Sequence, residues 1–293
     1  MTVSVFAPAK VNLYLHVLGR RADGYHRLDS LVVFADIGDR VTARPADSLT
    51  LTVGGPEVAA IAGLGEDNLV MRAARLLAAQ AGIGAGAALH LDKQLPAAAG
   101  IGGGSSDAAA TLRALAALWD APLGEPEVMA IALQLGADVP ACLAGRPVWV
   151  GGIGEEIMPA GGLPEAGIML ANPRRPLPTA AVFQRYRGPH RMAGRFDPVP
   201  SDAAGLAAIL SSRHNDLTAA ALELVPEIGA VLARLAALPG ALLARMSGSG
   251  ATCFALFADR AAALAARRTL ALAEPGWWSA AGMLTSGPAA IGD

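Results

Sequence analysis

A glycine-rich segment that runs directly into a helical pattern is the feature that most restricts how this chain can fold. Residues 100–107 read Gly-Ile-Gly-Gly-Gly-Ser-Ser-Asp, and the pattern after them predicts a helix over residues 105–119. Glycines let backbone N–H groups approach an anion closely, and a helix start adds unpaired N–H donors and the positive end of the helix dipole. The segment predicts a phosphate-binding loop; a flexible turn with an ordinary serine cap is the alternative.

This loop matches neither of the two best-known phosphate-binding patterns. No Lys-Ser or Lys-Thr pair follows the glycines, and their spacing does not fit Gly-x-Gly-x-x-Gly. A loop without its own lysine needs a cation from elsewhere. Among the 23 lysines and arginines only Lys10 and Lys93 are lysines, and Lys10 shares the polar face of a predicted strand with Asn12, roughly 7 Å away by strand rise. Both side chains could bind phosphate or hydroxyl groups, or lie on a solvated sheet face.

Asp138 is the candidate catalytic base. It follows a helix predicted over residues 126–136 and precedes Val139-Pro140, where proline restricts the backbone. A carboxylate there would accept the proton of a substrate hydroxyl, the task of the base in phosphoryl transfer. Taken alone, an aspartate that forms a turn is the alternative.

The order of elements predicts an α+β protein with two domains, over residues 1–160 and 161–293. A stretch rich in Gly, Pro and Glu at residues 151–167 marks the boundary. In residues 10–17, alternation places Lys10, Asn12, Tyr14 and His16 on one face. The first part has predicted strands at 3–6, 10–17, 28–34, 40–44, 49–53 and 87–91 and a helix at 68–81 capped by Asp67. The second has strands at 168–171, 242–247, 252–257 and near Met283, and helices at 179–187, 203–211, 227–238 and 260–272.

Composition argues against several classes of protein. The formal net charge of −2 provides no basic field for nucleic acid and no polybasic patch for a membrane. We find no signal-peptide pattern at the N-terminus and no run of about 18 apolar residues. Cys142 and Cys253 are far apart, which favours neither a zinc site nor a disulfide. We therefore expect a cytoplasmic protein without nucleic-acid or membrane partners; the sequence does not indicate its oligomeric state.

Three blocks of sequence resemble the superfamily of galactokinase, homoserine kinase, mevalonate kinase and phosphomevalonate kinase over nearly the whole chain. The first block also looks like the family of 4-diphosphocytidyl-2-C-methyl-D-erythritol kinases of the non-mevalonate isoprenoid pathway, because Asp-Gly-Tyr-His is specific to that family. The blocks are Pro8-Ala-Lys-Val-Asn-Leu-Tyr-Leu with Asp23-Gly-Tyr-His26, the segment from Leu95-Pro96 to Gly-Gly-Gly-Ser-Ser-Asp107, and Met246-Ser-Gly-Ser-Gly-Ala251.

The resemblance implies both a fold and an activity. The implied fold is an N-terminal sheet-and-helix domain joined to a ferredoxin-like C-terminal domain, with the active site in the cleft between them. The implied activity uses ATP and Mg²⁺ to phosphorylate a hydroxyl of a small molecule that carries a cytidine diphosphate group, giving a 2-phosphate. One departure stands out: Ala97-Ala-Ala99 occupies positions where family members more often have glycine.

Roles for individual residues also follow from the resemblance. Lys10 and Asp138 would be catalytic. The substrate would be bound by Asn12, Tyr25, His26, Thr179 and Phe183. ATP would be bound by Pro96, Ala97, Ala98, Ala99, Gly100, Ile101, Gly102, Gly103, Gly104, Ser105 and Ser106.

Each of these residues has an alternative when the resemblance is set aside. Tyr25 and His26 could be ordinary turn residues, and Phe183 could belong to a core. Residues 247–250, Ser-Gly-Ser-Gly, could form a tight turn or close over phosphates or substrate hydroxyls. For the whole protein, the alternatives are a superfamily kinase acting on mevalonate or homoserine, and a non-catalytic ATP-binding module. The latter would not need Lys10 and Asp138 in the same cleft.

Overall fold

The computed structural model describes residues 1–63, 65–287 and 291–292 of the chain. Its strands are β1 (Val3–Arg20), β2 (His26–Ala46), β3 (Thr50–Gly54), β4 (Gly86–Asp92), β5 (Val148–Gly151), β6 (Glu156–Pro159), β7 (Gly167–Asn172), β8 (Leu243–Met246), β9 (Cys253–Phe257), β10 (Trp278–Thr285) and β11 (Ile291–Gly292). Its α-helices are α1 (Leu69–Ala81), α2 (Gly103–Trp119), α3 (Glu125–Leu135), α4 (Val139–Ala144), α5 (Thr179–Arg185), α6 (Ala203–Ser211), α7 (Thr218–Leu224), α8 (Glu227–Ala236) and α9 (Arg260–Ala273). Within the part of the chain described, no helix is long and apolar enough to cross a membrane.

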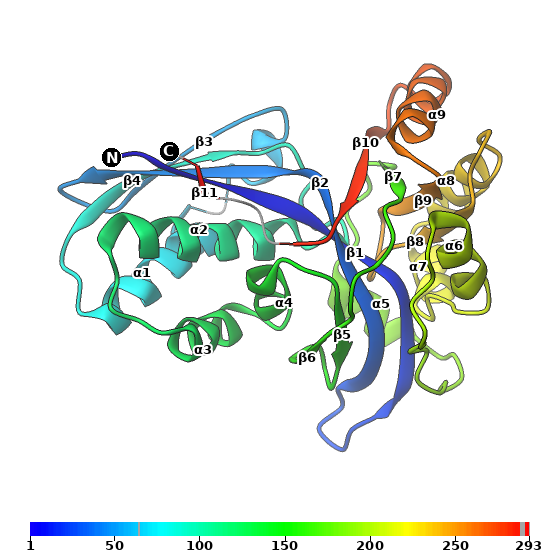
Figure 1. Cartoon of the computed structure of the whole chain (residues 1–293), viewed down its shortest axis with the longest axis horizontal. Coiled ribbons are helices and arrows are strands. Elements are labelled where there is room, and N and C mark those ends of the chain that lie inside the picture. The colour runs from blue at the N-terminus through cyan, green and yellow to red at the C-terminus, as the bar shows by residue number, and fades with distance from the viewer. Residues whose placement is uncertain (64, 288–290, 293) are drawn as a thin grey trace.

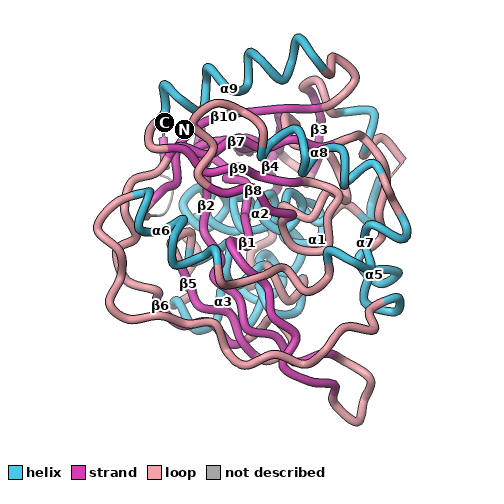
Figure 2. Tube along the Cα trace, turned by 90° about the vertical axis from the view of Figure 1, so that its right-hand side faces the viewer, coloured by secondary structure: helices cyan, strands magenta, loops and turns pink. Residues whose placement is uncertain are grey.

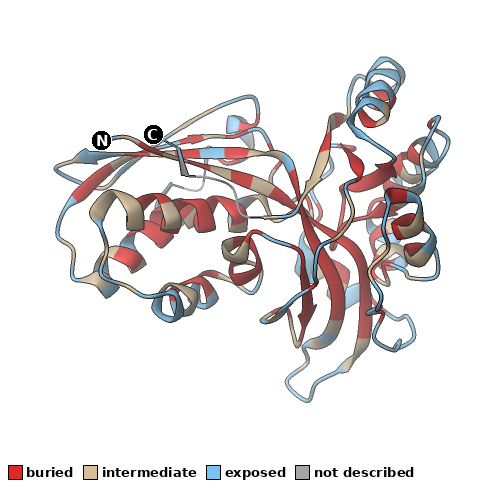
Figure 3. Cartoon of the chain, in the orientation of Figure 1, coloured by how far each residue is buried: buried red, intermediate tan, exposed pale blue. Residues whose placement is uncertain are grey.

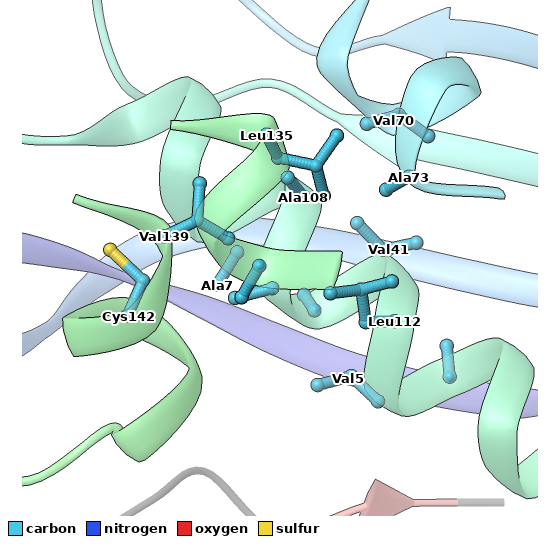
Figure 4. Close-up of a cluster of buried hydrophobic side chains, with 14 of the residues drawn as sticks. Val5, Ala7, Val41, Val70, Ala73, Ala108, Leu112, Leu135, Val139 and Cys142 are labelled. Atoms are coloured by element: carbon cyan, nitrogen blue, oxygen red, sulfur yellow. The ribbon is translucent and has the colours of Figure 1, made fainter. Parts of the chain in front are cut away.

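The N-terminal half is a sheet covered on one face by helices (Figure 1). β1 and β2 form a long antiparallel pair, β4 pairs with β2, and β3 adds to β4 in parallel. Helix α2 packs on this sheet through Ala108 and Leu112, which lie with Val5, Ala7 and Val41 in one buried cluster (Figure 4). The small alanine side chains let the helix approach the strands closely, and so fix the position of its N-terminus.

The C-terminal half contains four antiparallel strands in the order β10-β7-β9-β8. Numbered along the chain, these strands have the spatial order 4-1-3-2, with helices between the first and second and between the third and fourth. This is the ferredoxin-like arrangement that the family resemblance implies. Figure 2 shows the four strands lying side by side with α8 and α9 beside them.

Two connections join the halves into one continuous sheet. β10 leaves the second half and pairs with β2 at Leu284↔Ala35 and Thr285↔Phe34. The far ends of β1 and β2 lie against the C-terminal half (Figure 1), and Leu15 belongs to its buried core. The strands at this junction are largely buried (Figure 3). The predicted domain boundary at residue 160 stays a prediction.

Several predicted element boundaries are wrong in instructive ways. Residues 3–6 and 10–17 belong to the single strand β1, because a register shift at Pro8/Ala9 accommodates the proline. Residues 28–34 and 40–44 likewise belong to the single strand β2. The side chain that caps α1 is Asn68, which accepts a hydrogen bond from the backbone N–H of Val70, and not Asp67. Helices α4 and α7 were not predicted.

The predicted polar face of β1 is interrupted by a second register shift, between Asn12 and Tyr14. Lys10 and Asn12 line a cavity, and Leu15 lines the same cavity. Tyr14 instead belongs to an apolar cluster, and the His16 ring lies against it with centroids 4.9 Å apart. A one-residue shift sends later side chains to the opposite face of a strand, so the alternation read from residues 10–17 fails at this point.

Candidate active site

The glycine loop has the backbone conformation that its composition predicts. Gly100 and Gly102 have φ of 73° and 63°, a left-handed region that favours glycine, and α2 begins at Gly103. A Cβ atom on Gly100 would lie 2.6 Å from the carbonyl oxygen of Gly250, and one on Gly102 would lie 2.9 Å from Cβ of Lys10. The first N–H groups of α2 have no acceptors within the helix, so they are available to an anion.

Three hydrogen bonds hold this loop between β1 and the turn of residues 247–250. The Lys10 N–H donates to the carbonyl of Ile101 at 2.9 Å, and the Thr252 N–H donates to the carbonyl of Ala99 at 3.1 Å. The hydroxyl of Ser247 donates to the carbonyl of Gly100 at 3.0 Å. The loop is therefore positioned by both halves of the molecule.

Lys10 and Asp138 form an ion pair beside the loop, with Nζ and Oδ1 2.8 Å apart. The Lys10 side chain is 6% exposed and that of Asp138 is 47% exposed. Asp138 occupies the N-cap position of α4 but its side chain makes no capping hydrogen bond, so the carboxylate is free to turn toward Lys10. Residues that are 128 positions apart in the sequence thus meet in one place.

A cavity of about 430 Å³ surrounds this ion pair. Seven of the eleven residues predicted to bind ATP line it; Pro96, Ala97, Ile101 and Ser106 do not. The Ser106 hydroxyl is buried and donates to the carbonyl of Pro8 at 2.7 Å, because α2 begins two residues earlier than predicted and turns Ser106 inward. The residues lining the cavity are Lys10, Asn12, Leu15, Leu28, Ser30, Val32, Leu69, Ala98, Ala99, Gly100, Gly102, Gly103, Gly104, Ser105, Ala137, Asp138, Val150, Ile153, Gly154, Thr179, Phe183, Leu217, Gly248 and Ser249.

A second cavity, of about 630 Å³, brings together the other residues predicted to bind substrate. Tyr25, His26, Thr179 and Phe183 line it, and Thr179 and Phe183 also line the first cavity. The hydroxyl of Thr179 lies 2.9 Å from that of Ser249, at the border between the two. The cavities adjoin, so a long ligand can extend from one into the other.

The aromatic rings at the second cavity form one stacked pair and one edge-on pair, and the ring of His26 takes part in both. His26 and Phe183 are stacked, with ring centroids 5.5 Å apart and an interplanar angle of 28°. Tyr186, which does not line the cavity, meets His26 edge-on with ring centroids 5.7 Å apart. Burial lowers the pKa of His26, as do the charges of Arg20 and His190, which favours the neutral form of its imidazole. Tyr25 is 61% exposed, with a ring available to a ligand.

Comparison with known proteins identifies the family. The GHMP kinases N terminal domain matches residues 68–146, and the GHMP kinases C terminal domain matches residues 201–274. The 4-diphosphocytidyl-2-C-methyl-D-erythritol kinase of Paramagnetospirillum magneticum is 52% identical over 97% of this chain and 99% of its own. That of Cereibacter sphaeroides is 54% identical over 94% of this chain and 96% of its own. The chain belongs to the 4-diphosphocytidyl-2-C-methyl-D-erythritol kinase family.

A solved structure agrees with this membership. A crystal structure of 4-(cytidine 5'-diphospho)-2C-methyl-D-erythritol kinase matches 97% of this chain and 100% of its own, with a TM-score of 0.80 at 36% sequence identity. The resemblance read from the three sequence blocks is confirmed, as is the predicted α+β kinase fold. As a GHMP kinase, the chain is a kinase that uses ATP.

Sequence reasoning missed a buried charge cluster beneath the glycine loop of this kinase. The Nζ of Lys93 lies 2.6 Å from Oδ2 of Asp39 and 2.7 Å from Oδ2 of Asp107, and all three side chains are buried. Asp107 is in the first turns of α2, and a Cβ atom on Gly103 would lie 3.2 Å from Nζ of Lys93. The cluster therefore fastens the start of α2 to the sheet. Its only signal in the sequence was that Lys93 is one of two lysines.

Both burial and the neighbouring charges shift the pKa values in this cluster. Burial raises the pKa of Asp107, and the negative charge of Asp39 raises it further, whereas Lys93 lowers it. The two carboxylates raise the pKa of Lys93 against the opposing effect of its burial, so the ammonium stays charged. Asp39 also accepts hydrogen bonds from the backbone N–H groups of Gln94 and Leu95 at 2.6 and 2.8 Å.

The turn of residues 247–250 is held by Asn215, which no sequence pattern singled out. Its side-chain amide donates to the carbonyls of Met246 and Gly248, each at 2.8 Å. Ser247 in turn accepts a hydrogen bond from the backbone N–H of Asn12 at 3.1 Å. The turn thus connects the glycine loop, β1 and the C-terminal half around the cavity.

Proposed function

We propose that this kinase transfers the γ-phosphoryl group of ATP to a hydroxyl of 4-diphosphocytidyl-2-C-methyl-D-erythritol, giving the 2-phosphate, a step in the non-mevalonate synthesis of isoprenoid precursors. One observation carries this proposal. The ion pair of Lys10 and Asp138 shares a cavity with the glycine loop, and that cavity adjoins a second one lined by Tyr25 and Phe183. A module that only bound ATP would not need this ion pair in the cleft.

The glycine loop would bind the phosphates of ATP. Gly103, Gly104 and Ser105 lie at the N-terminus of α2 and line the cavity, where backbone N–H groups and the helix dipole favour negative charge. Lys10 adds a compact ammonium at the same cavity. The anchoring of α2 by its buried alanines and by Lys93 keeps these donors in place before ATP arrives, which is the form of electrostatic stabilisation that phosphoryl transfer needs most.

Asp138 would receive the proton of the acceptor hydroxyl. As the hydroxyl oxygen forms its bond to the γ-phosphorus, the bond from that phosphorus to the β–γ bridging oxygen breaks and ADP leaves. Oδ1 of Asp138 is paired with Lys10, which leaves its other carboxylate oxygen to accept the proton. Lys10 keeps the carboxylate oriented and stabilises its charge until that transfer.

The residues present fit a magnesium ion that is held mainly by ATP. Among the described residues no group of three or more His, Cys, Asp or Glu side chains could hold a metal by itself. Mg²⁺ is commonly bound by one or two protein oxygens together with substrate phosphates and water. Ser105 provides a hydroxyl oxygen at the cavity. When bound there, Mg²⁺ would neutralise charge on the phosphates.

The second cavity would hold the cytosine base. We propose that the base stacks between Tyr25 and Phe183, with the side chain or the backbone of His26 at its edge. His26 and Phe183 are too close together for a base to fit between them, since two stacked contacts require about 7 Å. The ring of Tyr25 is exposed and free to form the other side of the stack. Asn12 and Thr179 would contact the part of the substrate between the base and the reacting hydroxyl.

We further propose that the protein works in the cytoplasm, without nucleic-acid or membrane partners. Both cysteines are buried free thiols, a state typical of reducing compartments. The net charge of −2 gives no basic field for nucleic acid or anionic lipid.

Release of ADP measured with four candidate acceptors tests the proposed function. The acceptors are 4-diphosphocytidyl-2-C-methyl-D-erythritol, 2-C-methyl-D-erythritol, mevalonate and homoserine. We expect turnover with the first only, because the other three lack a group that fills the second cavity. Comparable turnover with mevalonate or homoserine would favour another kinase of the superfamily, and no turnover with any acceptor would favour an ATP-binding module.

A further inference from the structure

Asn12, which lines the first cavity, has one buried polar atom without a hydrogen-bond partner among the described residues. Asn12 lies on β1; its backbone N–H donates to the hydroxyl of Ser247 at 3.1 Å, and its Nδ2 donates to the hydroxyl of Ser30 at 2.7 Å. Its Oδ1 has no hydrogen-bond partner in the described part of the chain. A buried amide oxygen left unpaired is costly, so a native structure that keeps one implies a missing partner. Asn12 and Ser30 both line the cavity.

Ser30 determines which way this amide faces. Its hydroxyl lies 2.5 Å from the carbonyl oxygen of Tyr14. A carbonyl only accepts and a serine has a single proton to donate, so the Ser30 hydroxyl donates to Tyr14 and can only accept from Asn12. Asn12 must therefore present its NH₂ group to Ser30, which leaves Oδ1 as a buried acceptor beside Gly248 of the cavity lining; a Cβ atom on Gly248 would lie 3.4 Å from it.

The register shift in β1 makes this arrangement possible. Asn12 pairs with Val32 and Tyr14 with Leu31, so Leu13 is the extra residue of a bulge. The carbonyl of Leu13 accepts a hydrogen bond at 2.6 Å from the buried guanidinium of Arg245. With Leu13 held on one side, the neighbouring carbonyl of Tyr14 is turned toward Ser30. The bulge is thus held by Ser30 of β2 at Tyr14 and by Arg245 of β8 at Leu13.

We propose that Ser30 is a positioning residue that orients Asn12 so that its Oδ1 accepts a hydrogen bond from a hydroxyl of the bound substrate. The inference rests on the proposed function in requiring a hydroxyl-bearing acceptor. The orientation of Asn12 also affects substrate specificity. Because Oδ1 can only accept a hydrogen bond, it favours a hydroxyl donor and disfavours a carboxylate oxygen at the same place. A polyol meets this requirement, and the carboxylate end of mevalonate or homoserine does not.

A double-mutant cycle on Ser30 and Asn12 tests the proposal. We expect Ser30→Ala to lower kcat/KM for the acceptor by about 10- to 100-fold, the span of a lost hydrogen bond with its partner left buried, with the KM for ATP unchanged. Asn12→Ala should cause a similar loss. Because Ser30 acts through Asn12, adding Ser30→Ala to Asn12→Ala should cost less than about twofold more. Losses that multiply in the double variant would overturn the proposal.

Two further measurements separate positioning from a structural role. Thr111→Val removes another buried hydroxyl, which donates to the carbonyl of Asp107 at 2.7 Å and does not line the cavity, and it should leave kcat/KM unchanged. Ser30→Cys keeps the side-chain size with a weaker hydrogen-bonding group and should give an intermediate loss. If Thr111→Val lowers kcat/KM as much as Ser30→Ala does, the effect belongs to stability and the proposal is wrong.

The side-chain amide signals of Asn12 provide a readout that needs no substrate. In the unliganded protein, NMR should show slow hydrogen exchange for the Asn12 NH₂ group, and Ser30→Ala should speed that exchange at least about tenfold, the factor lost with one hydrogen bond. Unchanged exchange would refute the orientation of Asn12 even if the protein phosphorylates the expected acceptor. Conversely, if another acceptor is the true one, the kinetic cycle run with it still tests Ser30 while the proposed function fails.

Discussion

Replacing Lys93 with methionine should destabilise this kinase strongly, although Lys93 lines neither of the two cavities that make up the site. Methionine has nearly the same length but removes the ammonium that pairs with the buried carboxylates of Asp39 and Asp107. Removing one partner of a buried ion pair typically costs about 3–5 kcal/mol. That is a large part of the total free energy of unfolding of an ordinary protein, about 5–15 kcal/mol.

Urea unfolding followed by circular dichroism measures this loss, and an exposed ion pair provides the matched control. Arg185 pairs with Glu223 on the surface, where the side chains are 57% and 53% exposed. Arg185→Met should therefore change the free energy of unfolding by less than about 1 kcal/mol. A Lys93→Met variant as stable as Arg185→Met would refute the argument that the cluster anchors α2. The KM for ATP should also rise in Lys93→Met, because Gly103 lies directly over the Lys93 ammonium.

The loss of folding stability in Lys93→Met should be larger at high pH than at low pH. Burial raises the pKa of Asp107 above its value in the unfolded chain. The folded state therefore holds a proton more tightly than the unfolded state, and its stability falls as pH rises through the folded pKa. Lys93 lowers the pKa of Asp107, so removing Lys93 raises that pKa further and enlarges the pH dependence of stability. Lowering the pH from about 8 to about 6 should return part of the lost stability to Lys93→Met, and a loss that increases instead would contradict this reasoning.

Two other substitutions probe the two cavities. Gly102→Ala should weaken ATP binding and turnover while circular dichroism shows an intact fold, because alanine at a φ of 63° costs about 1–2 kcal/mol and its Cβ would lie 2.9 Å from Cβ of Lys10. Gly84→Ala is the control, since a Cβ atom at Gly84 has no neighbouring atom. If titration shows that Gly102→Ala binds ATP as tightly as the wild type, the loop is not part of the ATP site. Tyr25→Ala should weaken binding of the cytidine substrate about 10- to 100-fold, since stacking on a base is worth about 1–3 kcal/mol. The control variant Tyr25→Phe should retain binding. If calorimetry finds that Tyr25→Ala binds this substrate as tightly as the wild type, Tyr25 does not stack on the base.

The parts of the site that depend on residues close together in the sequence were predictable from the sequence. The glycine loop and the helix after it were read from local pattern, because positive φ and helix starts leave clear residue preferences. Even here one detail failed: α2 begins at Gly103, so Ser106 points inward. Ala98 has a φ of 49°, a conformation that favours glycine, which agrees with the glycine that the family resemblance implies at these positions.

Contacts between distant residues were not predictable from pattern. Lys10 and Asp138 were paired only through the family resemblance, since nothing in either segment specifies the other. Lys93 and Asp39 are 54 positions apart, and their meeting depends on how β2 and the loop after β4 pack together. The bulge after Asn12 also escaped notice, because its cause is the pairing of β1 with β2 and the hold of Arg245, not the local sequence.

Phosphoryl transfer by Asp138→Asn is the most direct test of the account, because it isolates the group that would receive the proton. Asparagine keeps the shape of the side chain, and Asp138 makes no capping hydrogen bond whose loss would disturb α4. With 4-diphosphocytidyl-2-C-methyl-D-erythritol and ATP, and the phosphorylated product measured by ³¹P NMR, we expect turnover to fall about 10²- to 10⁴-fold while the affinity for ATP stays unchanged. A variant that keeps more than about a tenth of wild-type turnover, against that scale, would contradict the assignment of Asp138 as the base.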